Sequence, residues 1–280
     1  MKILLWIGDA PNQRAFANKI SEKFHLSGIV LEQNRAKRKH SISKVLLAIL
    51  ERIFLSSIRE SWKLLQRNYS DNYADYPSVE TIRVDNINAE LAYDFSQKID
   101  ADLILVSGTR LVRKRMLSLK PRIGILNLHT GLSPYVKGGP NCTNWCIATG
   151  QYHMVGNTVM WIDEGIDSGN ILTSTSIPID WGHCSLSKIH RAVMEQAHEL
   201  YIDAVRFLVN GGHSSVPQST IGPGKTFYTR DWTLRKKLQL VWNLKKIQHS
   251  HTLQKEVAQR TQALTTIPLA TPRFSQSMQE

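Results

Sequence analysis

The stretch Gly-Ile-Leu-Asn-Leu-His at residues 124–129, followed by Asp-Glu-Gly-Ile-Asp-Ser-Gly-Asn at residues 163–170, decides the interpretation of this chain. The first run is apolar except at Asn127 and His129, a pattern typical of a buried strand that ends in polar groups. Side chains two residues apart on a strand lie on the same side, so these two can face one pocket. The second run places Asp167 near two glycines after another predicted strand. We therefore expect an amide, an imidazole and a carboxylate to meet at one site.

Predicted strands and helices alternate on both sides of this stretch. Apolar runs predict strands at residues 3–7, 29–31, 81–84, 102–106, 123–128, 155–162 and 171–179. Apolar residues at helical spacing predict helices at about residues 12–24, 43–66, 88–99, 141–149, 185–209 and 232–247, with a short one ending at 119. This order predicts an α/β fold with a mostly parallel sheet flanked by helices. A short helical extension and a tail of about twenty residues are expected at the C-terminus.

Two strand ends are expected to border a ligand site, because ligands of parallel sheets collect at the carboxyl edge of the strands. The strand at 102–106 breaks at Gly108, which predicts a pocket wall over residues 108–112. The turn after the first strand has Gly8 as its only glycine, so it matches neither a dinucleotide fingerprint nor a phosphate loop. Its helix start can hold an anion, or Asn12 can act as a simple helix cap.

Composition indicates a mainly globular protein. The chain has 280 residues, of which 42% are hydrophobic and 21% charged, and a net charge of +12. That charge suits an anionic partner such as a nucleotide, a folate, RNA or an acidic membrane, and a general solubility charge is equally open. Three cysteines without a Cys-x-x-Cys motif favour a reduced, cytoplasmic setting, and no metal is expected at Cys142 and Cys146. No secretion signal is visible, and no apolar run reaches the roughly 20 residues of a spanning helix.

Three further segments allow predictions about surface contacts and exposure. The basic run at residues 35–40 with the apolar-rich helix at 43–66, and the basic helix at 232–247, can touch a membrane surface or a partner. A helix packed on the domain, with a solvated basic loop, is the alternative that we favour for the first of these. On the helix at 185–209, His190 and His198 are predicted to be surface positions rather than ligands.

The chemistry of the site is inferred from its side chains. The amide of Asn127 can donate a hydrogen bond to an oxyanion during attack on a carbonyl. A histidine titrates near neutral pH and can transfer a proton, and a carboxylate at Asp167 would orient it and favour its charged form. Because no Ser or Cys nucleophile pairs obviously with His129, direct acyl transfer to an amine is preferred. A merely polar strand end is the alternative.

The wider order of motifs resembles the formyltransferase family. The motifs are the strand from Asp102 to Gly108, Asn127-Leu128-His129, Leu132-Ser133-Pro134 with Lys137-Gly138, Gly156-Asn157-Thr158-Val159, and Gly165-Ile166-Asp167-Ser168-Gly169. The likeness is good from about residue 85 to 180 and looser from 1 to 32. Two departures are Thr130-Gly131, where many members carry Pro-Ser, and Lys137, where an arginine is common.

The resemblance implies a Rossmann-like α/β fold and 10-formyltetrahydrofolate as formyl donor. Asn127 would stabilise the oxyanion, His129 would act in proton transfer, and Asp167 would position His129 or a water and help to remove the proton of the amine. The pterin-binding residues would be Gly108, Thr109, Arg110, Leu111, Val112, Ile162, Asp163, Glu164, Gly165 and Ile166. The amine acceptor would contact Gly8, Asp9, Asn12 and Lys137.

The number of candidate acceptors can be reduced by elimination. Only about 65 residues follow Gly212, which is too few for the β-barrel domain of methionyl-tRNA formyltransferases, so we favour a nucleotide-linked amino sugar, as in polysaccharide biosynthesis. Formylation of aminoacyl-tRNA, for which the charge argues, a formyl hydrolase and a non-catalytic binding protein remain alternatives. Residues 1–212 would form the catalytic domain, with a helical insertion at about 35–76, and residues 213–280 an extension and tail. We expect a cytoplasmic protein with an anionic small-molecule substrate. Contact with the inner face of the membrane, RNA binding and a homo-oligomer stay open.

Overall fold

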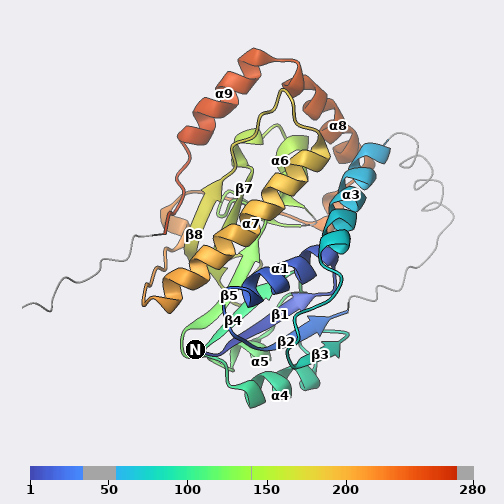
Figure 1. Ribbon diagram of the computed structural model, residues 1–280. Helices are drawn as coiled ribbons and strands as arrows, with labels where there is room; N and C mark the ends of the chain where they lie inside the picture. The colour runs from blue at the N-terminus through green and yellow to red at the C-terminus, as the bar shows by residue number, and fades with distance from the viewer. Residues whose placement is uncertain (34–54, 140, 270–280) are drawn as a thin grey trace, which may run out of the picture.

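The computed structural model describes residues 1–33, 55–139 and 141–269 and is built on a seven-stranded sheet (Figure 1). Its strands follow the order β3-β2-β1-β4-β5-β7-β8. The first five are parallel to one another: β1 (Ile3–Gly8), β2 (Leu26–Glu32), β3 (Thr81–Val84), β4 (Leu103–Ser107) and β5 (Gly124–His129). The strands β7 (Gly156–Trp161) and β8 (Ile171–Ser176) join antiparallel. The predicted α/β fold with a mostly parallel sheet is confirmed.

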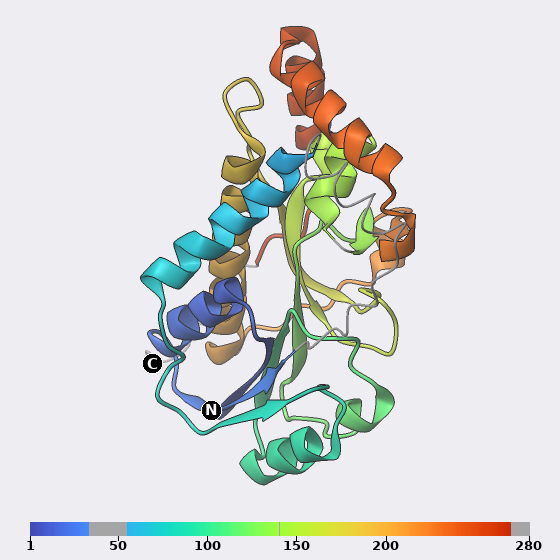
Figure 2. The same ribbon diagram turned by 90° about the vertical axis from the view of Figure 1, so that its right-hand side faces the viewer.

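Helices cover the two faces of the sheet unequally. On one face lie α1 (Pro11–Ser21) and the long α7 (Leu186–Val209), with α3 (Ser56–Asn72) packed over them. The other face is covered by α4 (Glu90–Ile99) and α5 (Lys114–Leu117), which pack on Leu4, Trp6, Val30, Ile104 and Val106. These two helices reach only the start of β5, at Ile125, and stop short of β7 (Figure 2), so the rest of this face is left for loops to cover.

The second covering layer over α7 overturns the surface positions predicted for its histidines. His190 is 3% exposed and His198 is 1% exposed. His190 contacts Asn144 and Ser61, whereas His198 packs between the rings of Phe16 and Tyr69. Burial lowers the pKa of both, to about 4 for His190 and about 3 for His198, so both rings are neutral near pH 7. The sequence shows one apolar stripe on this helix. It does not show that other helices also pack against the sides of the helix that carry the two histidines.

Two helix boundaries also differ from the predictions. The cap of α1 is Ala10, with Pro11 in the first turn, so Asn12 is not the helix cap. Of the helix predicted at residues 43–66, the part up to residue 54 lies outside the described residues. Its described part, α3, runs on to Asn72, six residues beyond the predicted end, and Tyr69 in this added turn is buried against α7.

The C-terminal extension packs on the rest of the chain through a core that it shares with apolar residues between 136 and 193, which we call the extension core. A parallel two-stranded sheet joins β6 (Val136–Gly138) to β9 (Lys225–Phe227). Behind it, α6 (Cys142–Ala148) contacts α8 (Leu234–Gln248), which is followed by α9 (His251–Gln262). The predicted helical extension is confirmed. The predicted tail is partly wrong, because Ile267 exchanges hydrogen bonds with Ser174 of β8 and so extends the folded part beyond α9.

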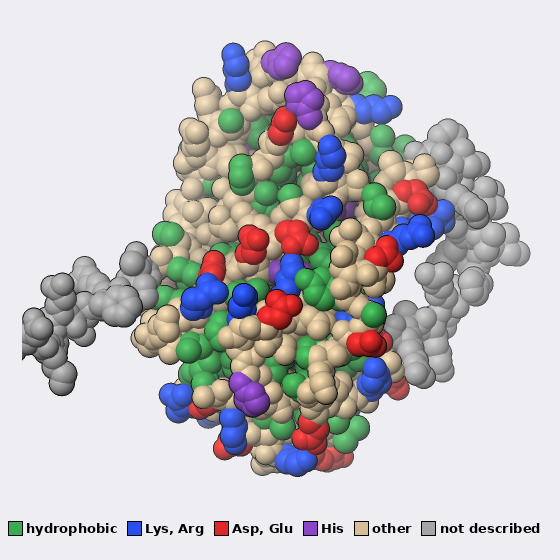
Figure 3. Space-filling view, viewed as in Figure 1, with side chains coloured by type: hydrophobic (Ala, Val, Ile, Leu, Met, Phe, Trp, Pro, Cys, Tyr) green, Lys and Arg blue, Asp and Glu red, His purple; other side chains and the backbone are tan. Residues whose placement is uncertain are grey.

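Charge is spread over the face that α3 and α7 cover. Figure 3 shows basic and acidic side chains interspersed on it rather than one large basic area. Within the described residues, no helix is both long and apolar enough to cross a membrane.

Candidate active site

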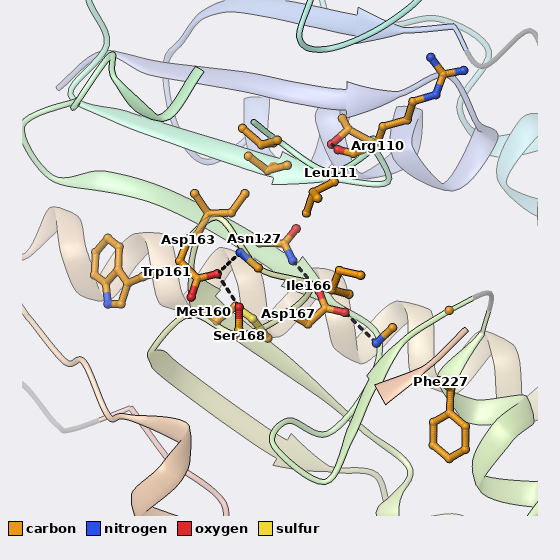
Figure 4. A pocket seen from close by; sticks show the side chains of 18 of the residues that line it. Arg110, Leu111, Asn127, Met160, Trp161, Asp163, Ile166, Asp167, Ser168 and Phe227 are labelled. Carbon is orange, nitrogen blue, oxygen red and sulfur yellow. Dashed lines mark hydrogen bonds between the residues drawn. The ribbon is translucent and has the colours of Figure 1, made fainter. Parts of the chain in front are cut away.

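A pocket of about 450 Å³ opens on the side of the sheet that α4 and α5 leave uncovered (Figure 4). Asn127 lies in its wall because its side chain points to the same face of β5 as Ile125, which packs in the core beneath α4 and α5. Three chain segments complete the wall: the loop after β4, the loop between β7 and β8, and the β6–β9 sheet. The lining residues are Val106, Thr109, Arg110, Leu111, Val112, Asn127, Gly138, Gly139, Met160, Trp161, Ile162, Asp163, Gly165, Ile166, Asp167, Ser168, Gly169, Phe227, Tyr228 and Thr229.

The structure brings the amide, the imidazole and the carboxylate together around Asp167. One carboxylate oxygen accepts a hydrogen bond from Asn127 Nδ2 at 3.4 Å. The other lies 3.3 Å from His129 Nδ1 and accepts the backbone N–H of Gly138 at 2.9 Å. Asp167 itself has a φ of 49°, a left-handed conformation that Asp tolerates better than most side chains. The carboxylate is therefore fixed on both sides by donors from β5 and β6.

His129 stands behind Asp167 and is not part of the pocket lining. The ring is only 7% exposed, and its Nε2 lies 3.1 Å from the carbonyl oxygen of Val136. Since Asp167 and Val136 present oxygen acceptors to the two ring nitrogens, both nitrogens are donors when the ring is protonated. Burial alone would lower the pKa of His129, but the negative charge of Asp167 and the contacts with Cys142 and Val136 raise it to about 10.

Two small groups close the far side of this ring. The thiol of Cys142 lies 3.5 Å from His129 Nε2, and burial raises the pKa of that thiol. At Gly131, a Cβ atom would lie 2.3 Å from His129 Nε2 and 2.8 Å from the Cys142 sulfur. Gly131, one of the departures from the family pattern, thus leaves the space that the imidazole and Cys142 occupy.

The loop that carries Asp167 is held from both ends. Asp163 accepts hydrogen bonds from the backbone N–H of Gly165 at 3.0 Å and from the Ser168 hydroxyl at 2.7 Å (Figure 4). From the C-terminal extension, Gln218 Nε2 donates to the carbonyl oxygens of Asp167 and Gly169, both at 2.8 Å. These bonds fix the backbone on each side of the carboxylate.

A buried hydroxyl lies at the point where β4 and β5 separate beside the pocket. Tyr201 of α7 is fully buried, and its hydroxyl accepts the N–H of Val106 at 3.0 Å and donates to the carbonyl of Leu126 at 2.8 Å. The last paired residues of the two strands are Val106 and Asn127. The hydroxyl therefore bonds to both strands immediately behind two residues of the pocket wall.

Most of the residues predicted to bind the donor line the pocket. They are Thr109, Arg110, Leu111, Val112, Ile162, Asp163, Gly165 and Ile166. Gly108 and Glu164 do not line it; the Gly108 backbone packs against Gly8, where a Cβ would lie 2.5 Å from its carbonyl oxygen. Glu32 is 2% exposed and accepts the N–H of Arg110 at 2.7 Å, which anchors this loop to β2.

The four residues predicted to contact the acceptor lie outside the pocket lining. Asn12 is 4% exposed and accepts a hydrogen bond from Gln66 of α3, and the Asp9 carboxylate accepts hydrogen bonds from Tyr76 and Gln33. Gly8 and Lys137 are likewise not in the lining, so the acceptor role of all four stays a prediction.

The sequence prediction missed the wall made by the extension. Phe227, Tyr228 and Thr229 reach the pocket because β9 pairs with β6 next to Gly138 and Gly139. Gln218 and Tyr201 were not predicted to have any role either. A three-residue strand and single polar side chains leave no periodic signal, so only the folded chain reveals them.

Residues 75–205 of the chain match the family model described as formyl transferase. The methionyl-tRNA formyltransferase of Clostridium tetani is 31% identical over 119 residues, which are 42% of this chain and 37% of that protein. The methionyl-tRNA formyltransferase of Deinococcus radiodurans is 38% identical over 90 residues, 31% of this chain and 27% of that protein. The matched part thus spans well under half of the length of these curated relatives.

Solved structures share the fold over most of the chain. A sugar N-formyltransferase from a Shewanella species has a TM-score of 0.55 at 17% identity, covering 87% of this chain and 88% of that one. An N-formyltransferase from Helicobacter canadensis, in complex with folinic acid and dTDP-3-aminofucose, has a TM-score of 0.54 at 15% identity, covering 87% of this chain and 81% of that one. At such identities the likeness extends to the fold alone.

Proposed function

We propose that this chain, which belongs to the formyltransferase family, transfers a formyl group from 10-formyltetrahydrofolate to an amine. The observation that carries the proposal is that Asn127 and Asp167 bond to each other in the wall of one pocket while a buried His129 supports Asp167 from behind. This arrangement offers a hydrogen-bond donor, a proton acceptor and a buried positive charge within a few ångströms. An amine that attacks a formyl carbon requires these three groups.

The pocket suits the donor by its chemistry. Leu111, Val112, Ile162 and Ile166 give it apolar walls, and most residues of the loop after β7 line it. A flat pterin needs apolar contact on its faces and backbone hydrogen bonds at its rim. When bound there, the folate would supply an activated formyl group, and the neutral amine of the acceptor would approach the same carbon.

Each polar group of the site has one role in this proposal. The amide of Asn127 has two N–H hydrogens, so one remains after its bond to Asp167 to stabilise the negative charge that develops on the formyl oxygen. The Asp167 carboxylate would accept the proton that the attacking amine loses, directly or through a water. The bond between the formyl carbon and N10 of the folate would then break, and N10 would take up that proton to leave as tetrahydrofolate. Protonated His129 would hold that carboxylate in place and add positive charge behind it.

A nucleotide-linked amino sugar is the acceptor that we propose. Two considerations support it. Of the structures described above, one is a sugar N-formyltransferase and the other is an N-formyltransferase with dTDP-3-aminofucose bound. The extension of this chain is helical and adds Tyr228 to the pocket wall, where its exposed ring can pack on the nucleotide end of such an acceptor. The ring of Phe227 is instead buried and stacks on Trp145.

Methionyl-tRNA is the second candidate acceptor. The sequence relatives that match residues of the catalytic core are methionyl-tRNA formyltransferases, and the chain carries a net charge of +12. Such an acceptor demands binding that weakens steeply with salt, because many counterions are released from the RNA. A nucleotide sugar, with two phosphates, predicts a much weaker dependence.

The experiment is a donor-consumption assay with an acceptor panel. Purified protein and 10-formyltetrahydrofolate are mixed with nucleotide-linked amino sugars or with methionyl-tRNA, and tetrahydrofolate release is followed by absorbance. We expect turnover with at least one amino sugar, and its loss in His129→Asn and Asp167→Asn. The exposed residues His25 and Asp94 give matched controls, His25→Asn and Asp94→Asn. Unchanged turnover in both site variants would refute the proposed mechanism, and formate release without an amine would indicate a hydrolase.

A further inference from the structure

The helix α8 carries charge of only one sign. Its residues Leu234–Gln248 include five basic side chains and no acidic one: Arg235, Lys236, Lys237, Lys245 and Lys246. The helix buries Leu240 and Ile247 against the extension core, and this fixes the direction of its other faces. On the outward face, Leu238 is 48% exposed and Trp242 is 73% exposed. Trp242 is thus a large apolar side chain held in water and flanked by lysines.

The described part of α3 lies beside α8, although the two are far apart in the sequence (Figure 1). Together they line a groove of about 780 Å³. Its apolar lining includes Leu240, Val241 and Leu244 from α8. Its charged lining residues are Lys63, Arg67, Lys245 and one acid, Glu60, whose carboxylate lies 3.6 Å from Lys63 Nζ. Leu64 of α3, also in the groove, is 59% exposed. We call the exposed side chains of this region the α3–α8 surface: Lys63, Leu64, Arg67, Leu238, Trp242, Lys245 and Lys246.

We propose that the α3–α8 surface binds a lipid membrane with anionic headgroups. Exposed Trp and Leu among Lys and Arg match the boundary between headgroups and acyl chains, where the indole packs on lipid and the cations reach phosphate. Each Lys or Arg near an anionic membrane strengthens binding by roughly fivefold. A helix with five cations and no anion is therefore complementary to such a surface.

Two other occupants fit these contacts less well. A single-stranded RNA could stack one base on Trp242, but the neighbouring exposed side chains Leu238 and Leu64 are aliphatic and offer no ring to a second base. A second copy of the chain, paired through α8 about a twofold axis, would bring two all-basic helices together and be opposed by their like charges. An anionic membrane can contact both the exposed apolar side chains and the cations of the α3–α8 surface.

The test is co-sedimentation of the full-length protein with vesicles of phosphatidylcholine alone or mixed with an equal part of phosphatidylglycerol. We expect at least tenfold stronger binding to the anionic vesicles, weakened by salt. Two paired variants should each weaken it at least tenfold: Leu238→Ala with Trp242→Ala, and Lys245→Glu with Lys246→Glu. The matched controls are Leu91→Ala, which is 57% exposed on α4, and Lys23→Glu with Lys114→Glu, both exposed away from α8.

Thermal unfolding and formyl transfer are measured on every variant, because neither should change when only this surface is altered. The proposal is overturned by equal binding to neutral and anionic vesicles, or by vesicle binding that survives both paired variants. It is also overturned if the lysine variant loses binding to transfer RNA but keeps binding to vesicles, or if light scattering shows that Trp242→Ala separates a dimer.

Discussion

The Nδ2 atom of Asn127 lies 3.4 Å from the Oδ1 atom of Asp167, across forty residues of chain. The bond joins a strand of the sheet to a loop that leaves the sheet, so the carboxylate depends on the strand for its position. Replacing Asp167 by Asn keeps the size of the side chain but removes the proton acceptor. We expect kcat to fall by about 10²–10⁴. We also expect stability near pH 7 to fall, because the ion pair with buried His129 is lost. Rapid-quench or absorbance kinetics measure this, with Asp94→Asn as control; a loss of less than tenfold would contradict a proton-transfer role.

The raised pKa of His129 predicts how stability depends on pH. Its folded-state pKa is about 10, above the unfolded value of about 6.5. The stabilisation is therefore fully present below pH 6.5 and is lost as the pH rises toward 10. Urea unfolding of the wild type and of His129→Asn should show a free-energy difference that shrinks between these values. In Asp167→Asn the pH dependence from His129 should be much flatter, because the carboxylate that raises the pKa is gone.

The hydroxyl of Tyr201 is predicted to hold the pocket side of β4 and β5. Tyr201→Phe removes the partner of the Val106 N–H and of the Leu126 carbonyl without removing the ring. Leaving these buried groups unpaired should cost about 1–3 kcal/mol of stability. Because Asn127 follows Leu126 directly, kcat should fall more than the KM for the donor rises. A variant that loses stability but retains full kcat would limit Tyr201 to a structural role. Tyr93→Phe, on α4, is the matched control.

The strands that position the site follow from the sequence, and the wall that the extension adds does not. Strands such as β4 are apolar on both sides because the sheet is covered on both faces. Such a strand is a continuous run of apolar residues, which the sequence alone reveals. The strand β9 has three residues and is set by its pairing with β6, a contact between positions about ninety residues apart. Likewise, nothing in the local pattern of α7 distinguishes a histidine facing water from one beneath α3.

Gln218 provides the clearest case of a residue that only tertiary structure reveals. Its amide ties the backbone of Asp167 and Gly169 to the extension, at 2.8 Å each. Gln218→Leu keeps the volume but removes both bonds, so the carboxylate should lose its fixed position. We expect kcat to fall about tenfold or more, since small displacements of catalytic groups are costly. The variant Gln218→Glu, which cannot donate, should behave alike. Normal kcat in both variants would show that Asp163 and Gly138 suffice to hold the loop.

Tyr228 should separate recognition of the acceptor from recognition of the donor. It is 42% exposed in the pocket wall and comes from the extension, outside the residues that match the family model. If the nucleotide of the acceptor packs on its ring, Tyr228→Ala should raise the KM for the acceptor by about five- to thirtyfold, the cost of about 1–2 kcal/mol of aromatic contact. The KM for 10-formyltetrahydrofolate should stay within twofold, because its predicted contacts lie on the loops after β4 and β7. Tyr228→Phe should restore the acceptor KM. A parallel rise in both KM values would instead place the donor against Tyr228.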